Sequence, residues 1–315
     1  MSGTLDTPIY RRFDLQRDLA PLVSLLQQVE QADQTGEAVT EAALRERLTW
    51  AGQDPALMIW VATLPHNASL VGYGRVQKTP HDENADLHIA VHPSWRRQGI
   101  GGHLFVHLLE RATDLGTRAL RAYADVQHEG ASRFVCALGF SPVSSYTRLR
   151  VSAQQPFPAR VLPEGFRTRS YDQIQRVDLY TEAMNHSYEG LWGHVQVTEE
   201  DVAGWLPHLN PAGIFLLFAP DDTLAGTCRA ELSAPPTPAQ GAPTGLIDAP
   251  GVIPQWRDAQ LTLPLLFTAI HWLLPQGPTT LELESWGDAP GTLALYRALG
   301  FRVIKEEISY RRKLE

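Results

Sequence analysis

The hydrophobic positions of this chain follow two different periods, which alternate along its length. Short runs with apolar residues at every second position, or at nearly every position, predict strands, as at residues 57–62, 70–76 and 87–91. Longer stretches with apolar residues three or four positions apart predict helices, as at residues 104–112. The chain is therefore predicted to contain both strands and helices throughout.

Both halves of the chain predict the same order of elements, βααβββαβαβ. In the first half the elements are expected at residues 9–13, 14–30, 40 onward, 57–62, 70–76, 87–91, 99–112, 119–124, a short helix through 134, and a terminal hairpin that ends near 151. In the second half they are expected at residues 166–170, 173–185, 198–205, 214–219, 224–232, 246–253, 261–274, 280–285, 291–299 and 306–312.

Short sequence matches support an internal repeat. The run Pro-Ser-Trp-Arg at 93–96 recurs as Pro-Gln-Trp-Arg at 254–257, and Leu-Gly-Phe at 138–140 recurs at 299–301, both 161 positions later. Upstream, Gly-Tyr-Gly-Arg at 72–75 recurs as Gly-Thr-Cys-Arg 154 positions later. A proline-rich insertion at 235–243 accounts for the difference. The repeat predicts two domains, residues 1–153 and 154–315, joined by a polar, proline-containing linker.

Composition narrows the class of protein. A chain of 315 residues with 43% hydrophobic residues can form two cores. Its net charge of −8 argues against non-specific binding to nucleic acid. No apolar run approaches the roughly 20 residues of a membrane span, and residues 1–6 do not resemble a signal peptide.

The two cysteines, Cys136 and Cys228, lie far apart in the sequence. They are expected to be buried, reduced thiols of a cytoplasmic protein. Neither cysteine belongs to a metal-ligand spacing, so no metal site is expected.

A glycine-containing turn connects the strand at 87–91 to the helix at 104–112. Its sequence is Arg-Arg-Gln-Gly-Ile-Gly-Gly at residues 96–102. Because glycine has no side chain, Gly99 and Gly101 let the backbone approach an anion closely. The N–H groups in the first turn of a helix lack acceptors and carry a partial positive charge. A strand, a glycine turn and a helix in this order therefore predict a phosphate-binding site.

The run Val-x-Pro-x-x-Arg-Arg-Gln-Gly-Ile-Gly at 91–101, followed about forty residues later by Leu-Gly-Phe, resembles the GNAT superfamily of N-acetyltransferases. The resemblance implies an α+β fold of two tandem GNAT domains, each a mixed, mostly antiparallel twisted sheet flanked by helices. The tandem layout is similar to that of the mycothiol synthase relatives. Acetyl-CoA is the implied cosubstrate.

The resemblance also assigns the cofactor-binding residues. Backbone N–H groups of the turn would hold the pyrophosphate, flanked by two arginines and a glutamine, while the preceding strand would present its backbone to the pantetheine arm. The residues concerned are Ile89, Val91, Arg96, Arg97, Gln98, Gly99, Ile100, Gly101 and Gly102.

The two copies differ at the catalytic positions that the family implies. The tyrosine that commonly protonates the leaving thiolate is Val135 in the first copy and Tyr296 in the second. Asp248, which aligns with Leu87 at the offset of 161, is a candidate base. In the first copy Asp86 and His88 share one strand face and are substitute candidates. The alternatives are a packing role for Tyr296, a turn role for Asp248 and a structural role for His88.

The turn of the second copy has lost the features of a phosphate site. Gln260 and Thr262 replace the two glycines, and Asp258 replaces Arg97. The expected function is therefore acetyl transfer to a small amine in a ternary complex, with the cofactor bound to the first copy of a monomer or homodimer. Two alternatives stay open: a CoA-binding sensor or scaffold without catalysis, and catalysis by the second copy.

Overall fold

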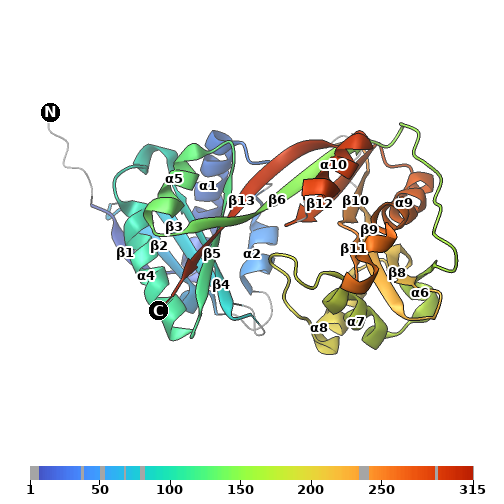
Figure 1. Cartoon of the computed structure of the whole chain (residues 1–315). Helices are drawn as coiled ribbons and strands as arrows, with labels where there is room; N and C mark the ends of the chain where they lie inside the picture. Colours follow the sequence, from blue (N-terminus) through green and yellow to red (C-terminus); the bar gives the residue numbers. More distant parts are fainter. Residues whose placement is uncertain are drawn as a thin grey trace. The chain divides into compact units, whose positions relative to one another are not determined.

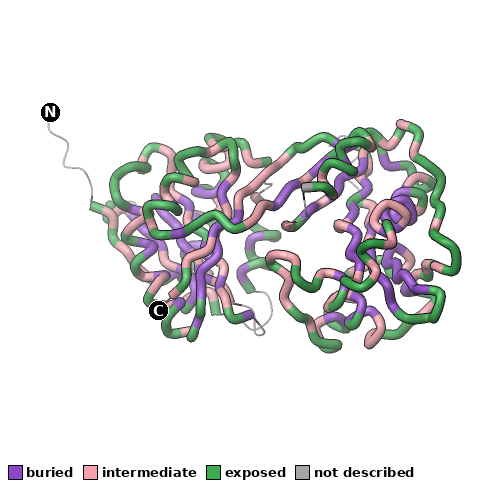
Figure 2. Tube along the Cα trace, in the orientation of Figure 1, coloured by how far each residue is buried: buried purple, intermediate pink, exposed green. Residues whose placement is uncertain are grey.

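The chain folds into two compact units (Figure 1). The computed structural model describes residues 7–36, 39–49, 54–66, 69–78, 82–233, 241–287 and 290–314. Unit 1 comprises residues 1–143 and 307–315, and unit 2 comprises residues 144–306. Each unit is a mixed sheet flanked by helices, and its buried residues concentrate in the strands (Figure 2).

Unit 1 has the sheet order β1-β2-β3-β4-β5-β13. Its only parallel pair among the described strands is β4 with β5, and the other neighbours are antiparallel. The elements are β1 (Ile9–Arg12), α1 (Leu15–Asp33), α2 (Glu41–Thr49), α3 (Pro55–Met58), β2 (Ile59–Thr63), β3 (Leu70–Gln77), β4 (Asn84–Val91), η2 (Pro93–Trp95), α4 (Ile100–Asp114), β5 (Ala119–Asp125), α5 (Glu129–Ala137), the start of β6 (Ser141–Ser152) and the end of β13 (Arg302–Lys313).

The two faces of the unit 1 sheet are covered by different helices. Helices α1 and α2 pack against β2 and β3 in a cluster that includes Phe13, Leu22 and Tyr73. Helix α4 packs on the other face, where a Cβ atom at Gly72 would lie only 2.7 Å from Ile100, and one at Gly74 only 2.6 Å from Leu108. The two glycines therefore allow α4 to approach β3 closely.

Unit 2 has the order β6-β12-β10-β9-β8-β7, and β11 pairs with β9 beside this path. The elements are β7 (Arg167–Ser170), α6 (Tyr171–Ile174), α7 (Val177–Ser187), α8 (Glu199–Trp205), η3 (Leu206–His208), η4 (Pro211–Gly213), β8 (Ile214–Phe218), β9 (Leu224–Ser233), β10 (Thr244–Asp248), β11 (Gly251–Val252), η6 (Pro254–Ala259), α9 (Thr262–Leu273), η7 (Leu274–Gln276), β12 (Thr280–Trp286) and α10 (Pro290–Ala298).

The last strands of the two sequence copies are exchanged between the units. Residues 146–152 of β6 pair with β12 in unit 2, and residues 307–313 of β13 pair with β5 in unit 1. The hairpin expected before residue 151 is therefore wrong, because β6 is one continuous strand of 12 residues. For the same reason the compact units differ from a simple division of the chain at residue 153.

Local signals located most helix ends. Helices α1 and α8 begin one residue after the expected positions 14 and 198, because Asp14 caps α1 and Thr198 forms a capping box with Asp201 at α8. The helix expected at 173–185 is instead split into α6 and α7, because Gln175 adopts a left-handed conformation with φ of 50°. Residues 57 and 58 end the short helix α3, so that strand begins later than expected.

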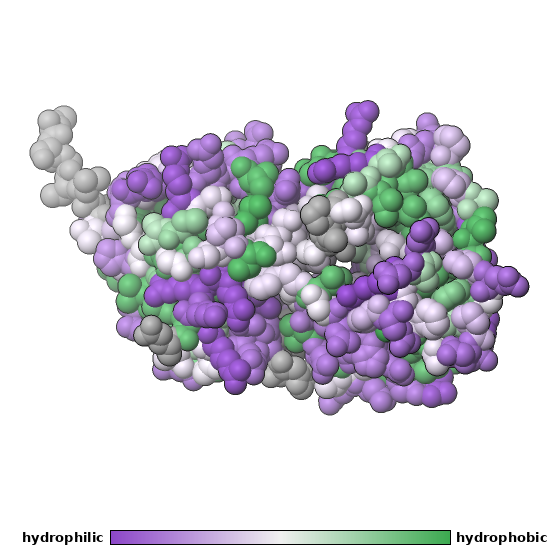
Figure 3. All heavy atoms as spheres, viewed as in Figure 1, coloured by the Kyte–Doolittle hydropathy of each residue, from purple (hydrophilic) through white to green (hydrophobic). Residues whose placement is uncertain are grey.

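The surface of each unit is largely hydrophilic in the view of Figure 3. Within the described residues, no helix is both long enough and apolar enough to cross a membrane. Most of the proline-rich insertion, residues 235–240, lies outside the described residues.

Candidate functional site

Strands β4 and β5 of unit 1 run side by side only at their beginnings. Their parallel pairing extends from Asn84↔Ala119 to Asp86↔Arg121. Strand β4 continues to Val91, but among the described strands it pairs there with β3 alone. Beyond Asp86 the two strands therefore part, and one edge of β4 carries backbone groups without a neighbouring strand.

The backbone of Ile89 and Val91 is turned toward this parting. The His92 N–H donates to the Val71 carbonyl of β3 at 3.0 Å. Because backbone direction alternates along a strand, Ala90 and His88 also face β3, whereas Val91 and Ile89 face the other way. Their N–H groups are available to an extended ligand that inserts beside β4, as an additional strand would.

The turn after β4 leaves several backbone N–H donors free at the start of α4. Arg97 and Gly99 adopt positive φ angles of 66° and 83°, and α4 begins at Ile100. The first intrahelical donor is His103, whose N–H bonds to the Gly99 carbonyl at 3.1 Å. The N–H groups of Ile100, Gly101 and Gly102 thus have no acceptor within the helix, which suits an anion.

The two helical glycines of the turn have different surroundings. A Cβ atom at Gly101 would lie 2.8 Å from the Phe134 ring of α5, so this glycine permits close packing of α4 and α5. No described atom lies within 4 Å of a Cβ atom at Gly102, which leaves space outside the helix start. A side chain at Gly102 would therefore extend into this space without disturbing the core.

Arg96 and Arg97 play different roles, although both were expected to flank the pyrophosphate. Arg96 forms a bidentate ion pair with Asp33 at 2.7 Å for both bonds, and its Nε donates to the Val91 carbonyl at 3.1 Å. Its charge is thus balanced, and it ties the turn to the end of α1. Arg97 is exposed and forms no hydrogen bond or ion pair with the described part of the chain. Of these two arginines, Arg97 is therefore the one available to pair with a bound anion.

Asp86 is held by an arginine. Arg121 donates to both carboxylate oxygens at 2.7 and 3.1 Å, and it also contacts Asp82 at 2.6 Å. Because the buried Arg121 needs these two carboxylates, Asp86 neutralises a charge in the structure and would have to leave it to act as a base.

His88 and Tyr123 flank the parting on the same face as Asp86. His88 is exposed, and its ring centroid lies 5.6 Å from that of Tyr73. Burial, and then the negative charge of Asp86, raise the pKa of Tyr123 to about 12. A phenol with so high a pKa is a poor proton donor to a thiolate, whose own pKa is about 8.5.

The corresponding region of unit 2 lacks this geometry. Strand β10 pairs with β12 over all five of its residues, up to Asp248↔Glu284. Pro250, which has no N–H, follows at the position equivalent to Ile89, and Gln260 holds the left-handed conformation of Gly99 with φ of 55°. Arg257 nevertheless keeps the bond of Arg96, from Nε to the Val252 carbonyl at 3.1 Å.

Strand pairing corrects the alignment of Asp248. It lies opposite Arg229, one step beyond the pair Ile247↔Ala230, just as His88 lies opposite Arg75. Its structural counterpart is therefore His88 and not Leu87. The sequence alignment is wrong by one residue, because the second copy has an extra residue between β10 and β11, and a shift of one residue moves a side chain to the other face of a sheet.

Asp248 and Tyr296 are both engaged in the packing of unit 2. Arg229 donates to the two oxygens of Asp248 at 2.7 and 3.1 Å. Tyr296 is fully buried in the core beneath α10. Tyr188 donates to the Ala249 carbonyl at 2.9 Å and covers the strand interruption, where a Cβ atom at Gly251 would lie 2.8 Å from its ring.

The cysteines differ from each other in accessibility. Cys228 is buried, and burial raises its pKa well above the ordinary value, so it is an inert thiol. Cys136 is exposed, so the expectation that it is buried is wrong. Within the described residues, no group of three or more histidine, cysteine or acidic side chains could hold a metal ion.

Sequence reasoning did not single out the arginines around the parting, Arg75 and Arg121. Arg75 ends the repeated Gly-x-x-Arg run at 72–75 and so stands where Arg229 stands in the second copy. That shared position was the only sequence signal for it.

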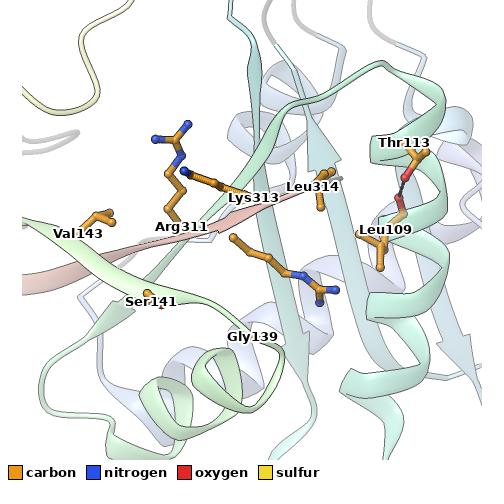
Figure 4. Close-up of a pocket in the computed structure, with 9 residues that line it drawn as sticks. Leu109, Thr113, Gly139, Ser141, Val143, Arg311, Lys313 and Leu314 are labelled. Carbon is orange, nitrogen blue, oxygen red and sulfur yellow. Dashed lines mark hydrogen bonds between the residues drawn. The ribbon is translucent and has the colours of Figure 1, made fainter.

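A pocket of about 800 Å³ lies at the far end of α4 from the glycine turn (Figure 4). Arg312 crosses it and donates to the Leu138 carbonyl at 2.6 Å. The pocket is separate from the turn that would hold a phosphate. Its lining residues are Leu109, Thr113, Gly139, Ser141, Val143, Arg311, Arg312, Lys313 and Leu314.

Comparisons with known proteins agree with this architecture. Residues 24–140 match the acetyltransferase (GNAT) family. The chain is 29% identical over 255 residues to a mycothiol acetyltransferase of Rhodococcus erythropolis. The alignment covers 78% of this chain and 82% of the relative.

Two solved structures share the fold over nearly the whole chain. A GCN5-related N-acetyltransferase of Sphaerobacter thermophilus aligns with a TM-score of 0.75 and 20% identity, covering 97% of this chain and 95% of the other. A tandem GNAT protein from the clavulanic acid biosynthesis pathway aligns with a TM-score of 0.65 and 17% identity, covering 97% and 98%. These similarities confirm the expected fold class of two GNAT domains in tandem.

Proposed function

Because residues 24–140 match the acetyltransferase (GNAT) family, we propose that this chain is a GNAT acetyltransferase. In this proposal unit 1 binds acetyl-CoA and transfers its acetyl group to the amine of a small acceptor. The transfer is direct, within a ternary complex of protein, acetyl-CoA and acceptor. The observation that supports this assignment most strongly is the parting of β4 from β5 beside a turn rich in N–H donors.

The residues of unit 1 suit the parts of acetyl-CoA. The N–H groups of Ile100, Gly101 and Gly102, together with Arg97, would hold the pyrophosphate, and Gln98 lies beside them. The pantetheine arm would run along Ile89 and Val91, whose backbone faces the parting. Arg96 would stabilise the turn instead of binding the pyrophosphate, because it already bonds to Asp33 and to the Val91 carbonyl.

The proposed reaction needs little chemistry from side chains. The neutral amine attacks the thioester carbonyl, an N–C bond forms, the C–S bond breaks and the thiolate leaves, while the attacking nitrogen loses a proton to water. N–H groups turned into the parting can stabilise the negative charge that develops on the carbonyl oxygen. Val135 has no proton to give, and Tyr123 is a poor donor, so water protonates the thiolate, which is a weak base near neutral pH.

Charge introduced at Gly102 tests the cofactor site. Acetyl-CoA should raise the melting temperature of the wild type, since a ligand that binds only the native state stabilises it. Gly102→Glu should abolish this shift, because the carboxylate would occupy the open space at the helix start. Gly204→Glu, at an exposed helical glycine of unit 2 with nothing within 4 Å, is the matched control. A melting-temperature shift as large as that of the wild type in Gly102→Glu would show that acetyl-CoA does not bind at this turn.

One observation favours a second candidate, a sensor or scaffold that binds acetyl-CoA without catalysis. The family's acid is Val135 in unit 1, and Asp86 is engaged by Arg121. Release of free thiol in the presence of amines distinguishes the candidates. Acetyl-CoA binding without any thiol release would favour the sensor.

The setting of this reaction also belongs to the proposal. We propose a cytoplasmic protein, a monomer or homodimer, with no nucleic acid or membrane partner. Its net charge of −8 and its two unpaired cysteines support that setting.

A further inference from the structure

The open face of the unit 1 sheet at the parting can be identified from side-chain alternation. Leu87 of β4, Leu120 of β5 and Tyr310 of β13 all pack into the cluster beneath α4. Their neighbours in sequence therefore point to the opposite face. Since α4 covers one face at the parting, an acceptor that meets a thioester there must approach from the other. This inference rests on the proposed function.

Strand register places a row of side chains on this open face. His88 of β4 lies opposite Arg75 of β3, and Ser309 of β13 lies opposite Tyr123 of β5. In the adjacent row, Arg121 lies beside Asp86 on one strand and Arg311 on the other. His88 is exposed and Arg75 is half-buried, so the face is accessible around the parting.

The positive charges on this face are unequally balanced. Arg121 is neutralised by Asp82 and Asp86. Arg75 and Arg47 of α2, by contrast, form no hydrogen bond or ion pair with the described residues. Burial raises the pKa of the neighbouring Tyr73, while the positive charges of Arg75 and Arg47 act to lower it. Of these two arginines, Arg75 lies directly opposite His88 and has no carboxylate partner among the described residues.

The second copy shows what normally balances this arginine. Arg229 holds the position of Arg75, and Asp248 opposite it accepts two hydrogen bonds from it. In unit 1 the residue opposite Arg75 is His88, which cannot replace a carboxylate. Unit 1 therefore has the half-buried Arg75, without a carboxylate partner in the described part of the chain, at the position where Arg229 of unit 2 pairs with Asp248. A partly desolvated arginine of this kind favours an anionic partner.

We propose that the acceptor of unit 1 carries an anionic group, a carboxylate or a phosphate, beside the amine that is acetylated, and that Arg75 binds this group. Directly opposed side chains in a sheet have Cβ atoms about 5 Å apart. Arg75 therefore lies one strand away from the parting, directly across β4 at His88. Small amino acids and aminoalkyl phosphates have this spacing between charge and amine.

Matched acceptors test the proposal. Amino acids are compared with their amides, and aminoalkyl phosphates with the corresponding amino alcohols, by thiol release at equal concentrations of neutral amine. The wild type should prefer the anionic members by about 10- to 100-fold in kcat/KM, the range expected for hydrogen bonds to a charged group. The two arms show whether carboxylate or phosphate is the preferred source of charge.

Arginine variants locate the preference. Arg75→Gln should lower kcat/KM for anionic acceptors about 10- to 100-fold, leave their neutral counterparts within a few-fold and leave KM for acetyl-CoA unchanged. Arg45→Gln is the control, because Arg45 lies on α2 and pairs with Glu41 at 3.1 Å. Arg75→Lys, which keeps the charge, should retain part of the preference and guards against misfolding.

Three results would overturn the proposal. The first is an equal kcat/KM for neutral and anionic acceptors. The others are an equal loss of kcat/KM for both classes in Arg75→Gln, or the same selective loss in Arg45→Gln as in Arg75→Gln. If acetyl-CoA binds but no amine is acetylated, the proposed function fails instead. Even then, calorimetry with N-acetyl amino acids and their amides on CoA-saturated protein tests the arginine site. Equal binding of acid and amide would contradict it.

Discussion

At the scale of single residues, several charged side chains that were candidates for the site form ion pairs within the fold instead. Arg96 and Asp86 were expected at the site by sequence position, yet both are engaged in bidentate ion pairs. The left-handed glycine at position 99 followed from the local motif. The partner of Arg96 could not be predicted, because Asp33 lies 63 positions earlier in the chain.

Asp18 illustrates such a structural charge and gives a pH prediction. Its carboxylate is 1% exposed and accepts bonds from Arg11, Arg17 and the Asp14 N–H. Burial acts to raise the pKa, but these hydrogen bonds outweigh it and lower the pKa from 3.8 to about 2. Because the folded-state value is the lower one, the stabilisation is present above pH ~4 and is lost as the pH falls toward 2.

Asp18→Asn should therefore lower the free energy of unfolding by ~1–2 kcal/mol at pH 7, a value reduced for solvent screening of the two arginines. The difference from wild type should shrink as the pH approaches 2. Urea unfolding at several pH values measures it, with the exposed Asp172→Asn as control. A difference that does not change with pH would contradict this assignment.

At the scale of elements, the sequence predicted what depends on neighbours along the chain. The starts of α1 and α8 lie within one residue of the expected positions, where Asp14, Thr198 and Asp201 supply the caps. The strand expected at 246–253 is interrupted at Ala249 and Pro250. The alternative of a turn at Asp248 anticipated a break there, but a run of apolar residues does not reveal an extra residue. That error shifted Asp248 onto the wrong counterpart.

The exchanged strand β13 makes a prediction about unit 1. Tyr310 is 5% exposed and packs with Phe105 and Leu120 in the cluster beneath α4. Tyr310→Ala should lower the free energy of unfolding by ~3 kcal/mol or more, as truncation of a buried aromatic does. Val303→Ala, on the same strand but 37% exposed, should cost much less. Equal effects of the two variants in urea unfolding would show that β13 does not stabilise unit 1.

At the scale of the whole molecule, the repeat was visible in the sequence and the exchange was not. Matching runs at 93–96 and 254–257 revealed two copies of one fold. The pairing of β6 with β12, and of β13 with β5, joins segments more than a hundred residues apart, and period-two patterns do not specify a strand's partner. The eroded turn at Gln260 and Thr262 predicts that unit 1 holds the phosphate site.

The central claim is that acetyl-CoA binds to unit 1, and a crystal structure of the full chain with acetyl-CoA tests it most directly. Density for the cofactor should lie between β4 and β5, with the pyrophosphate on the N–H groups of Ile100, Gly101 and Gly102 and the pantetheine along Ile89. Cofactor bound instead between β10 and β12, beside Gln260, would contradict the assignment of the site to unit 1.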